Sequence, residues 1–188
     1  MNTTIQKTSR PSFDLLRQKI GWLCEMIRWL IVAYLIWTLY RNLAPLMAPT
    51  LTAAEWNTYW GLPPDTVTVT KVFINRAIVM ITFSAAAVMG FAVWKLMGAY
   101  LAGQIFSIEA AGRLKWVGTT ALVAALVDIA VRPFMLGTLS SEILKKVGWL
   151  DWIDPTDLLY VLIALFVFAL GHIQGTAAEI NNEHQQFV

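Results

Sequence analysis

The sequence predicts an all-α, polytopic membrane protein, a four-transmembrane-helix bundle with short interfacial helices. The 188-residue chain is 57% hydrophobic and only 14% charged, which leaves too few charges to cover a soluble domain of this size. Its apolar residues also fall into blocks of about 20 or more, the length that a helix needs to cross ~30 Å of hydrocarbon. We expect transmembrane helices at about 22–43, 72–101, 107–138 and 155–179, within one domain spanning 22–180.

Residues 1–21 are predicted to form a cytoplasmic or interfacial segment. Ser12 can cap a short helix with an apolar stripe, so we expect a lead-in that lies along the membrane. The first span then begins near Trp22, and Pro45 and Pro49 are predicted to stop it. Because this apolar block is full-length, it is expected to stay as an anchor rather than be cleaved as a signal peptide.

The loop over 44–71 has features of its own. Residues 52–55, with the sequence TAAE, fit a capping box. They predict a short helix that carries Trp56 and Trp60 to the headgroup level, where such aromatic rings are favoured. Residues 66–70 alternate like a strand but have no evident partner, so an extended segment is expected.

The second and third spans are joined by a short link. In the second span, Ala86 and Gly90 form a small-xxx-small pair that lets a neighbouring helix approach closely. Ser107 is a favourable N-cap, and Glu109 suits the positive end of a helix. One helix is therefore expected from Ser107 through the whole third span.

The fourth span follows a second outer segment, 140–152, in which Trp149 and Trp152 are predicted membrane anchors. Residues 154–157 combine a cap, a proline at the first helical position and an acid in the first turn, which together indicate a helix start. The tail, 181–188, is polar and expected to be cytoplasmic.

The positive-inside rule gives an orientation. Lys and Arg near the helix ends number about seven on the face that holds both termini and about four on the other. We therefore expect a bacterial inner (cytoplasmic) membrane protein with both termini in the cytoplasm. The first group is Lys7, Arg10, Arg17, Lys19, Lys95, Arg113 and Lys115; the second is Arg41, Lys71, Lys145 and Lys146.

Two charged residues lie inside the third span. Asp128 and Arg132 are one helical turn apart and share a face. Charges at this depth cost several kcal/mol unless they are paired or wetted. An ion pair facing the interior, joined by Arg76 from the second span, is the favoured interpretation; a proton or ion relay is the alternative.

No residue pattern indicates catalysis, a cofactor or a metal. His172 lies in the GxxxG sequence formed by Gly171 and Gly175, which predicts either internal packing, the favoured option, or a dimerisation face. A lone histidine near a helix end is more often a hydrogen-bonded polar residue than a ligand. Cys24 is expected to act as a small apolar residue.

Tryptophans fall mostly at the predicted ends of the spans, which is typical of an interfacial aromatic belt. We assign this role to seven of the nine tryptophans in the chain, namely Trp22, Trp56, Trp60, Trp94, Trp116, Trp149 and Trp152.

Two stretches carry a resemblance to a known family. Residues 101–115 (LAGQIFSIEAAGRLK) and 178–188 (AEINNEHQQFV) resemble the link and the C-terminal ending of the bacterial membrane family called domain of unknown function 2975. The resemblance covers about 20–188 and departs at His184, where the family commonly has asparagine. It implies a four-helix inner-membrane protein with no established reaction, and some members are encoded beside small helix-turn-helix regulators.

The sequence therefore predicts a non-enzymatic protein that acts through protein–protein contacts, as a regulatory or accessory subunit, with a protein partner or as a homo-oligomer. A small transporter or ion-coupled channel using Asp128 and Arg132 is the alternative. Nucleic acid is not an expected partner, because the net charge is only +2 and no basic run is present. The predicted docking residues are Phe106, Ile180, Phe187 and Val188.

Overall fold

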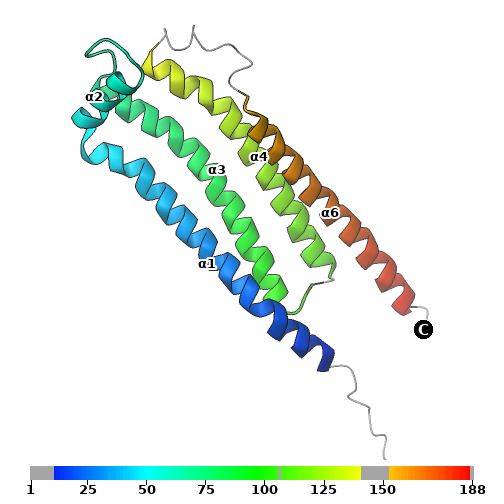
Figure 1. Ribbon diagram of the computed structural model, residues 1–188. Helices are drawn as coiled ribbons and strands as arrows, with labels where there is room; N and C mark the ends of the chain where they lie inside the picture. Colours follow the sequence, from blue (N-terminus) through cyan, green and yellow to red (C-terminus); the bar gives the residue numbers. More distant parts are fainter. Residues whose placement is uncertain (1–10, 106, 141–152, 187–188) are drawn as a thin grey trace, which may run out of the picture.

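The computed structural model describes residues 11–105, 107–140 and 153–186. This part of the chain is helical, and its five helices follow one another along the sequence (Figure 1). They are α1 (Pro11–Met47), α2 (Pro49–Tyr59), α3 (Val69–Leu101), α4 (Ile108–Leu139) and α6 (Pro155–Gln186).

Four of these helices are long and apolar enough to cross a membrane, which confirms the predicted fold class. The candidate spans are Gly21–Met47, Val69–Leu101, Ile108–Leu139 and Pro155–Ile180, with mean hydropathies between 1.5 and 2.1. Large apolar side chains remain exposed along all four, as expected for surfaces that lipid covers. The chain is therefore a multi-pass membrane protein.

The long helices lie side by side in chain order (Figure 1). Helix α3 packs between α1 and α4, and α4 packs between α3 and α6. Within the described residues, no Cα atoms of α1 and α6 lie within 8 Å of each other. The start of α1 and the end of α6 lie at one end of the molecule, and α2 lies at the other. For brevity we call these the terminal end and the α2 end.

Polar contacts fasten α3 to α4 at the α2 end. The Lys71 ammonium donates to the carbonyl of Leu139 at 3.1 Å, and the Asn75 amide donates to the carbonyl of Met135 at 2.9 Å. Helix C-terminal carbonyls lack partners within their own helix, and a lysine there also suits the helix dipole. These contacts hold the end of α4 against the start of α3.

Helix α1 differs from its prediction at both ends. It begins at Pro11 and continues without a break into the span, so the separate interfacial lead-in is replaced by the first turns of α1. Gly21 is the weakest helix former where the two segments join; it costs about 1 kcal/mol but does not stop a helix. Pro45 lies inside the helix, which ends at Met47. Pro45 removes one donor near the end of the helix, where few bonds depend on it.

Helix α2 begins earlier than the predicted capping box. Its N-cap is Ala48 and its first residue is Pro49, so Thr52 lies inside the helix and does not cap it. The Thr52 hydroxyl instead donates to the carbonyl of Pro45 at 3.2 Å, which ties α2 to the end of α1. Proline at the first position of α2 explains the earlier start, because its ring fixes a helical φ and its missing donor has no role there.

The segment after α2 folds back on that helix. Asn57 exchanges two hydrogen bonds with the backbone of Val67, at 3.3 Å and 2.9 Å. Thr68 then caps α3 by accepting from the Lys71 amide. The predicted extended segment therefore ends at Thr68, and residues 69–70 belong to α3.

The remaining boundaries lie close to the predicted ones. Ser107 caps α4 by accepting from the Ala110 amide at 3.0 Å, and α4 runs unbroken to Leu139 as expected. Helix α6 starts at Pro155 as predicted but continues to Gln186, beyond the predicted end at 179. Residues 180–186 contain neither proline nor glycine, so nothing in them forces the helix to end.

Candidate functional site

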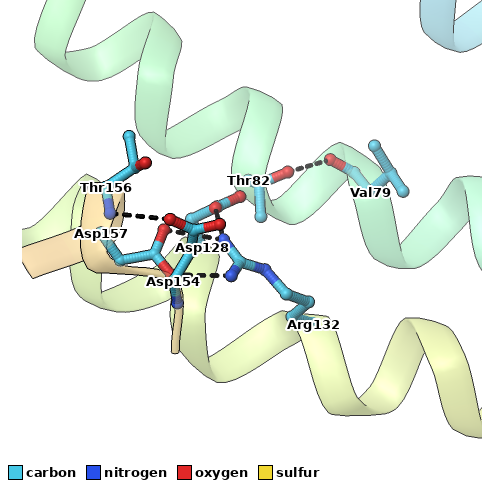
Figure 2. Close-up of polar contacts among 7 residues, drawn as sticks. All are labelled: Val79, Thr82, Asp128, Arg132, Asp154, Thr156 and Asp157. Atoms are coloured by element: carbon cyan, nitrogen blue, oxygen red, sulfur yellow. Dashed lines mark hydrogen bonds and ion pairs between the residues drawn. The ribbon is translucent and has the colours of Figure 1, made fainter. Parts of the chain in front are cut away.

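An ion-pair cluster joins α4 to the start of α6. The Arg132 guanidinium donates to both carboxylate oxygens of Asp157, at 2.7 Å and 2.9 Å, and to Asp128 at 2.9 Å (Figure 2). The two-pronged contact with Asp157 is the stronger geometry, because two parallel charge-assisted bonds fix the guanidinium plane. Asp157 is 8% exposed and Asp128 55% exposed, so the buried carboxylate is the principal partner of Arg132.

Asp157 is placed by the helix start that the sequence predicts. The Asp154 amide donates to Asp157 at 2.8 Å, and the Thr156 amide donates to the Asp154 carboxylate at 2.8 Å. This is a reciprocal capping arrangement with aspartates at both positions. The hydrogen bonds from Thr156 lower the pKa of Asp154. The same turn that starts α6 therefore aims Asp157 at Arg132.

Arg76 does not join this cluster, which corrects that expectation. Its guanidinium carbon lies 4.9 Å from the centre of the Trp56 ring, in contact with α2 rather than with Asp128. The third member is Asp157, which the sequence did not single out for this role. Two features of the sequence could have pointed to this pair: Asp157 lies in the first turn of the last span, and Arg132 lies near the end of the span before it.

Helix length places Arg132 near the expected membrane boundary, with Asp128 one turn deeper. Helix α4 has 32 residues and is about 48 Å long, so about 9 Å at each end extends beyond ~30 Å of hydrocarbon when the helix is centred. Arg132 lies about 10 Å before Leu139. This level is close to the headgroups, where paired charges cost least. The geometry suits a clamp between α4 and α6.

An apolar cleft opens beside the cluster. It has a volume of about 540 Å³ and is lined by residues of all four long helices. Asp128 and Asp157 lie on its wall. Small side chains, including Ala86 and Ala124, line much of the rest. Since no Cα atoms of α1 and α6 lie within 8 Å of each other in the described chain, the cleft lies where the row of helices is not closed.

The predicted packing glycines lie between helices of the same chain. A Cβ at Gly171 would come within 2.6 Å of the Lys115 backbone nitrogen, and one at Gly175 within 3.3 Å of the Lys115 ammonium. A Cβ at Gly90 would lie 3.0 Å from Ile31. Sequence reasoning missed Gly118, where a Cβ would come within 2.5 Å of the Phe168 backbone. Close approach of α4 and α6 thus depends on Gly118 as much as on the GxxxG sequence.

The described tryptophans differ in their surroundings. Trp22 and Trp116 are exposed near the terminal end, and Trp60 is exposed beside α2. Trp56 and Trp94 are partly covered, and each lies against an arginine: Arg76 at 4.9 Å and Arg28 at 3.9 Å. These cation–π contacts hold charge beside aromatic surface near the ends of the spans. Trp149 and Trp152 lie outside the described residues.

Of the predicted docking residues, the structure describes Ile180. Ile180 is exposed on α6, whereas Phe106, Phe187 and Val188 lie outside the described part of the chain. Nearby, the Gln174 amide donates to the carbonyl of Ile105 at 2.7 Å. This bond holds the link between α3 and α4 against α6.

No cluster of three metal-binding side chains occurs among the described residues. His172 packs edge-on against Phe168, with ring centres 5.2 Å apart. Cys24 is buried in an apolar cluster with Ala92, Leu96 and Val117. Both residues therefore have a packing role in the described structure.

Comparison with known proteins gives one family. The family model described as "Protein of unknown function (DUF2975)" matches residues 31–188, which includes the four candidate spans except the first turns of α1. No curated protein matches the chain, and no solved structure does.

Proposed function

The chain belongs to the DUF2975 family, and we propose that it is a non-enzymatic protein of the bacterial inner membrane that acts by binding a protein partner. In this proposal it is a regulatory or accessory subunit of a membrane complex. Both termini face the cytoplasm, because the terminal end carries more Lys and Arg near the helix ends than the α2 end does.

The observation that carries the proposal is the length of the two outer helices at the terminal end. Helix α1 starts at Pro11 and α6 continues to Gln186, and the sequences of these two helix ends are rich in charged and polar residues: three charges at positions 14, 17 and 19, and NNEHQQ over 181–186. The start of α1 and the end of α6 lie at the same end of the molecule (Figure 1), so their polar turns lie together beyond the apolar part of the bundle. Two projecting helices offer a preformed surface to a cytoplasmic partner, which lowers the ordering cost of binding.

Ile180 is the predicted contact residue that the structure describes on this surface. It is 51% exposed and is the last apolar residue before the polar stretch 181–186 of α6. Ile173 lies two turns earlier on the same face of α6 and is 66% exposed. The two isoleucines are chemically identical, but in this proposal only Ile180 meets a protein, whereas Ile173 meets lipid.

Site-specific photo-crosslinking in native membranes tests the proposal. A crosslinker at Ile180 is expected to give one discrete protein adduct, and one at Ile173 none. Ile180→Asp should abolish co-purification of the adduct partner in mild detergent, whereas Ile180→Leu should retain it. Adducts of equal abundance at both positions, or none at either, would contradict the proposal. An adduct of twice the chain mass would identify a second copy as the partner.

A small transporter or ion-coupled channel is the second candidate. It is favoured by the position of Asp128, which lines the cleft and is 55% exposed. An ionisable group facing such a cleft could bind a coupling ion. Asp128→Asn should then abolish flux in proteoliposomes, with Glu109→Gln at the terminal end as the control. Absence of flux in the unmodified protein at every pH tested would remove this candidate.

A further inference from the structure

A polar cleft lies at the α2 end, where α1, α2 and α3 meet. It has a volume of about 700 Å³, and its wall includes Arg41 of α1, Glu55 and Trp56 of α2, and Arg76 of α3. Two guanidinium groups therefore face one carboxylate. The site has an excess positive charge, and the function proposed above does not use it.

Neither arginine has a carboxylate partner within the described residues. The ion pairs there belong to Arg28, Arg113 and Arg132, so Glu55 lies beyond ion-pair distance of Arg41 and Arg76. Trp56 covers one face of the Arg76 guanidinium, and the Arg76 Nε is buried with no hydrogen-bond acceptor. The Arg76 guanidinium therefore has unused donor capacity, and an anionic ligand in the cleft would supply an acceptor for its nitrogens.

The depth of the two arginines corresponds to the level of lipid phosphates. Arg41 lies about 9 Å before the end of α1 at Met47, and Arg76 lies about 10 Å after the start of α3 at Val69. Helix α3 has 33 residues and is about 20 Å longer than the hydrocarbon layer, so about 10 Å extends beyond it at each end when the helix is centred. Both guanidinium groups therefore lie where headgroups meet hydrocarbon.

The polar cleft continues into the apolar one. Tyr34, Thr38 and Asn42 of α1 line both. Below them the walls are mostly apolar, with Phe83 of α3 and Ala124 of α4 among the lining residues. The two carboxylates on the wall, Asp128 and Asp157, are both bound by Arg132. A charged upper part above an apolar lower part matches one phosphate joined to an acyl chain. We propose that an anionic phospholipid occupies this site, with its phosphate on Arg41 and Arg76 and a chain in the apolar cleft.

Native mass spectrometry tests the proposal. The full chain is first reconstituted in vesicles of equal parts phosphatidylglycerol and phosphatidylcholine, and the lipid that stays bound after extraction is then measured. One phosphatidylglycerol per chain is expected. Arg76→Gln should lower its occupancy about tenfold, the loss typical of one charge-assisted hydrogen bond. Arg28→Gln is the matched control, because Arg28 also lies over a tryptophan and has a buried Nε without a partner, but it is paired with Glu25. Equal occupancy in both variants would overturn the proposal.

A second pair of variants tests the acyl chain. Ala124 lines the apolar cleft, whereas Ala130 is exposed on the opposite face of α4. Ala124→Phe should reduce lipid occupancy, and Ala130→Phe should not. If inorganic phosphate displaces the lipid and Ala124→Phe has no effect, the site binds a free anion and the lipid is excluded. A co-purifying protein that replaces the lipid would exclude it too.

Folding is checked for each variant by its melting temperature in detergent. Should Arg76→Gln fail to fold, Arg41→Gln carries the same test, because the Arg41 side chain is exposed and forms no ion pair among the described residues. Retention of the lipid in a folded Arg41→Gln protein at the unmodified level would then overturn the proposal. The outcome is independent of the cytoplasmic partner, since Arg41 and Arg76 lie at the opposite end of the molecule.

Discussion

Asp157 does two things at once: it completes the first turn of α6 and it binds Arg132 of α4. Each contact lowers the entropic cost of the other, because a carboxylate that the helix start already holds loses little conformational freedom when the guanidinium binds. Asp128 makes a single contact from an exposed position on the same helix as Arg132. The sequence could reveal only the local pair, since spacing on one helix is visible in the chain and proximity between two helices is not.

The two aspartates should therefore differ in their effect on stability. Breaking a buried ion pair costs about 3–5 kcal/mol, whereas an exposed pair contributes about 0–1 kcal/mol. Because Arg132 is 32% exposed, we expect Asp157→Asn to lower the free energy of unfolding by about 2 kcal/mol, and Asp128→Asn by less than about 0.5 kcal/mol. Melting temperatures in one detergent would measure the order. A larger loss for Asp128→Asn would show that Asp128 is the main partner.

The cap of α6 should respond to acid. The amide of Thr156 donates to the carboxylate of Asp154 and lowers its pKa, so the cap contributes fully above the ordinary pKa of an aspartate and is lost as the pH falls through the lowered value. The protection factor of the Thr156 amide in hydrogen exchange should follow this decline. The Asp154→Asn variant keeps an acceptor at this position and has no charge to lose. The protection factor of its Thr156 amide should therefore stay constant over the same pH range.

At the scale of the element, glycine decides how closely α4 and α6 pack. A Cβ at Gly118 or Gly171 would meet the backbone of the opposing helix, which cannot move without separating the two helices. We expect Gly118→Ala and Gly171→Ala each to cost about 1–3 kcal/mol, seen as a lower melting temperature. Gly175→Ala should be milder, because its Cβ would meet the flexible end of Lys115.

Two other glycines serve as controls for this prediction. A Cβ at Gly98 or Gly112 would have no neighbour within 4 Å, and both residues lie inside helices. Alanine there should be neutral or stabilise by up to about 1 kcal/mol, the difference in helix propensity. Equal losses at all four positions would show that backbone conformation, and not helix separation, is what glycine provides in this protein.

Element boundaries could be predicted where the deciding residues are local. Ser107 and the turn at Pro155 act within one turn of sequence, and both starts agree with the structure. The predictions that Pro45 stops the first span and that Thr52 caps the next helix were wrong. The effect of each residue depends on its position relative to a helix end that the sequence does not mark. Pro45 lies near the end of α1, and Thr52 bonds back to it rather than to its own helix. The capping sequence was present, but the earlier Pro49 starts α2.

At the scale of the whole molecule, four crossings could be predicted because hydrophobic length alone requires them. The contacts between helices could not, because the apolar residues on all sides of each span show no stripe that marks a neighbour. For the same reason, the sequence could not predict the close approach at Gly118 or the apolar cleft. The family match over residues 31–188 agrees with the four-helix arrangement. It gives no orientation in the membrane, which rests on the distribution of Lys and Arg alone.

The orientation gives the last prediction. Cys24 is buried and is the chain's single cysteine, so a membrane-impermeant maleimide should not label the unmodified protein. Tyr59 on α2 is 80% exposed. Tyr59→Cys should therefore be labelled in cells whose outer membrane has been removed and whose inner membrane is intact. Glu179→Cys on α6 should be labelled only after the membrane is permeabilised, because the proposed orientation, which rests on the excess of Lys and Arg, puts the terminal end in the cytoplasm. The reverse pattern would place the α2 end, and with it the lipid site, in the cytoplasmic leaflet.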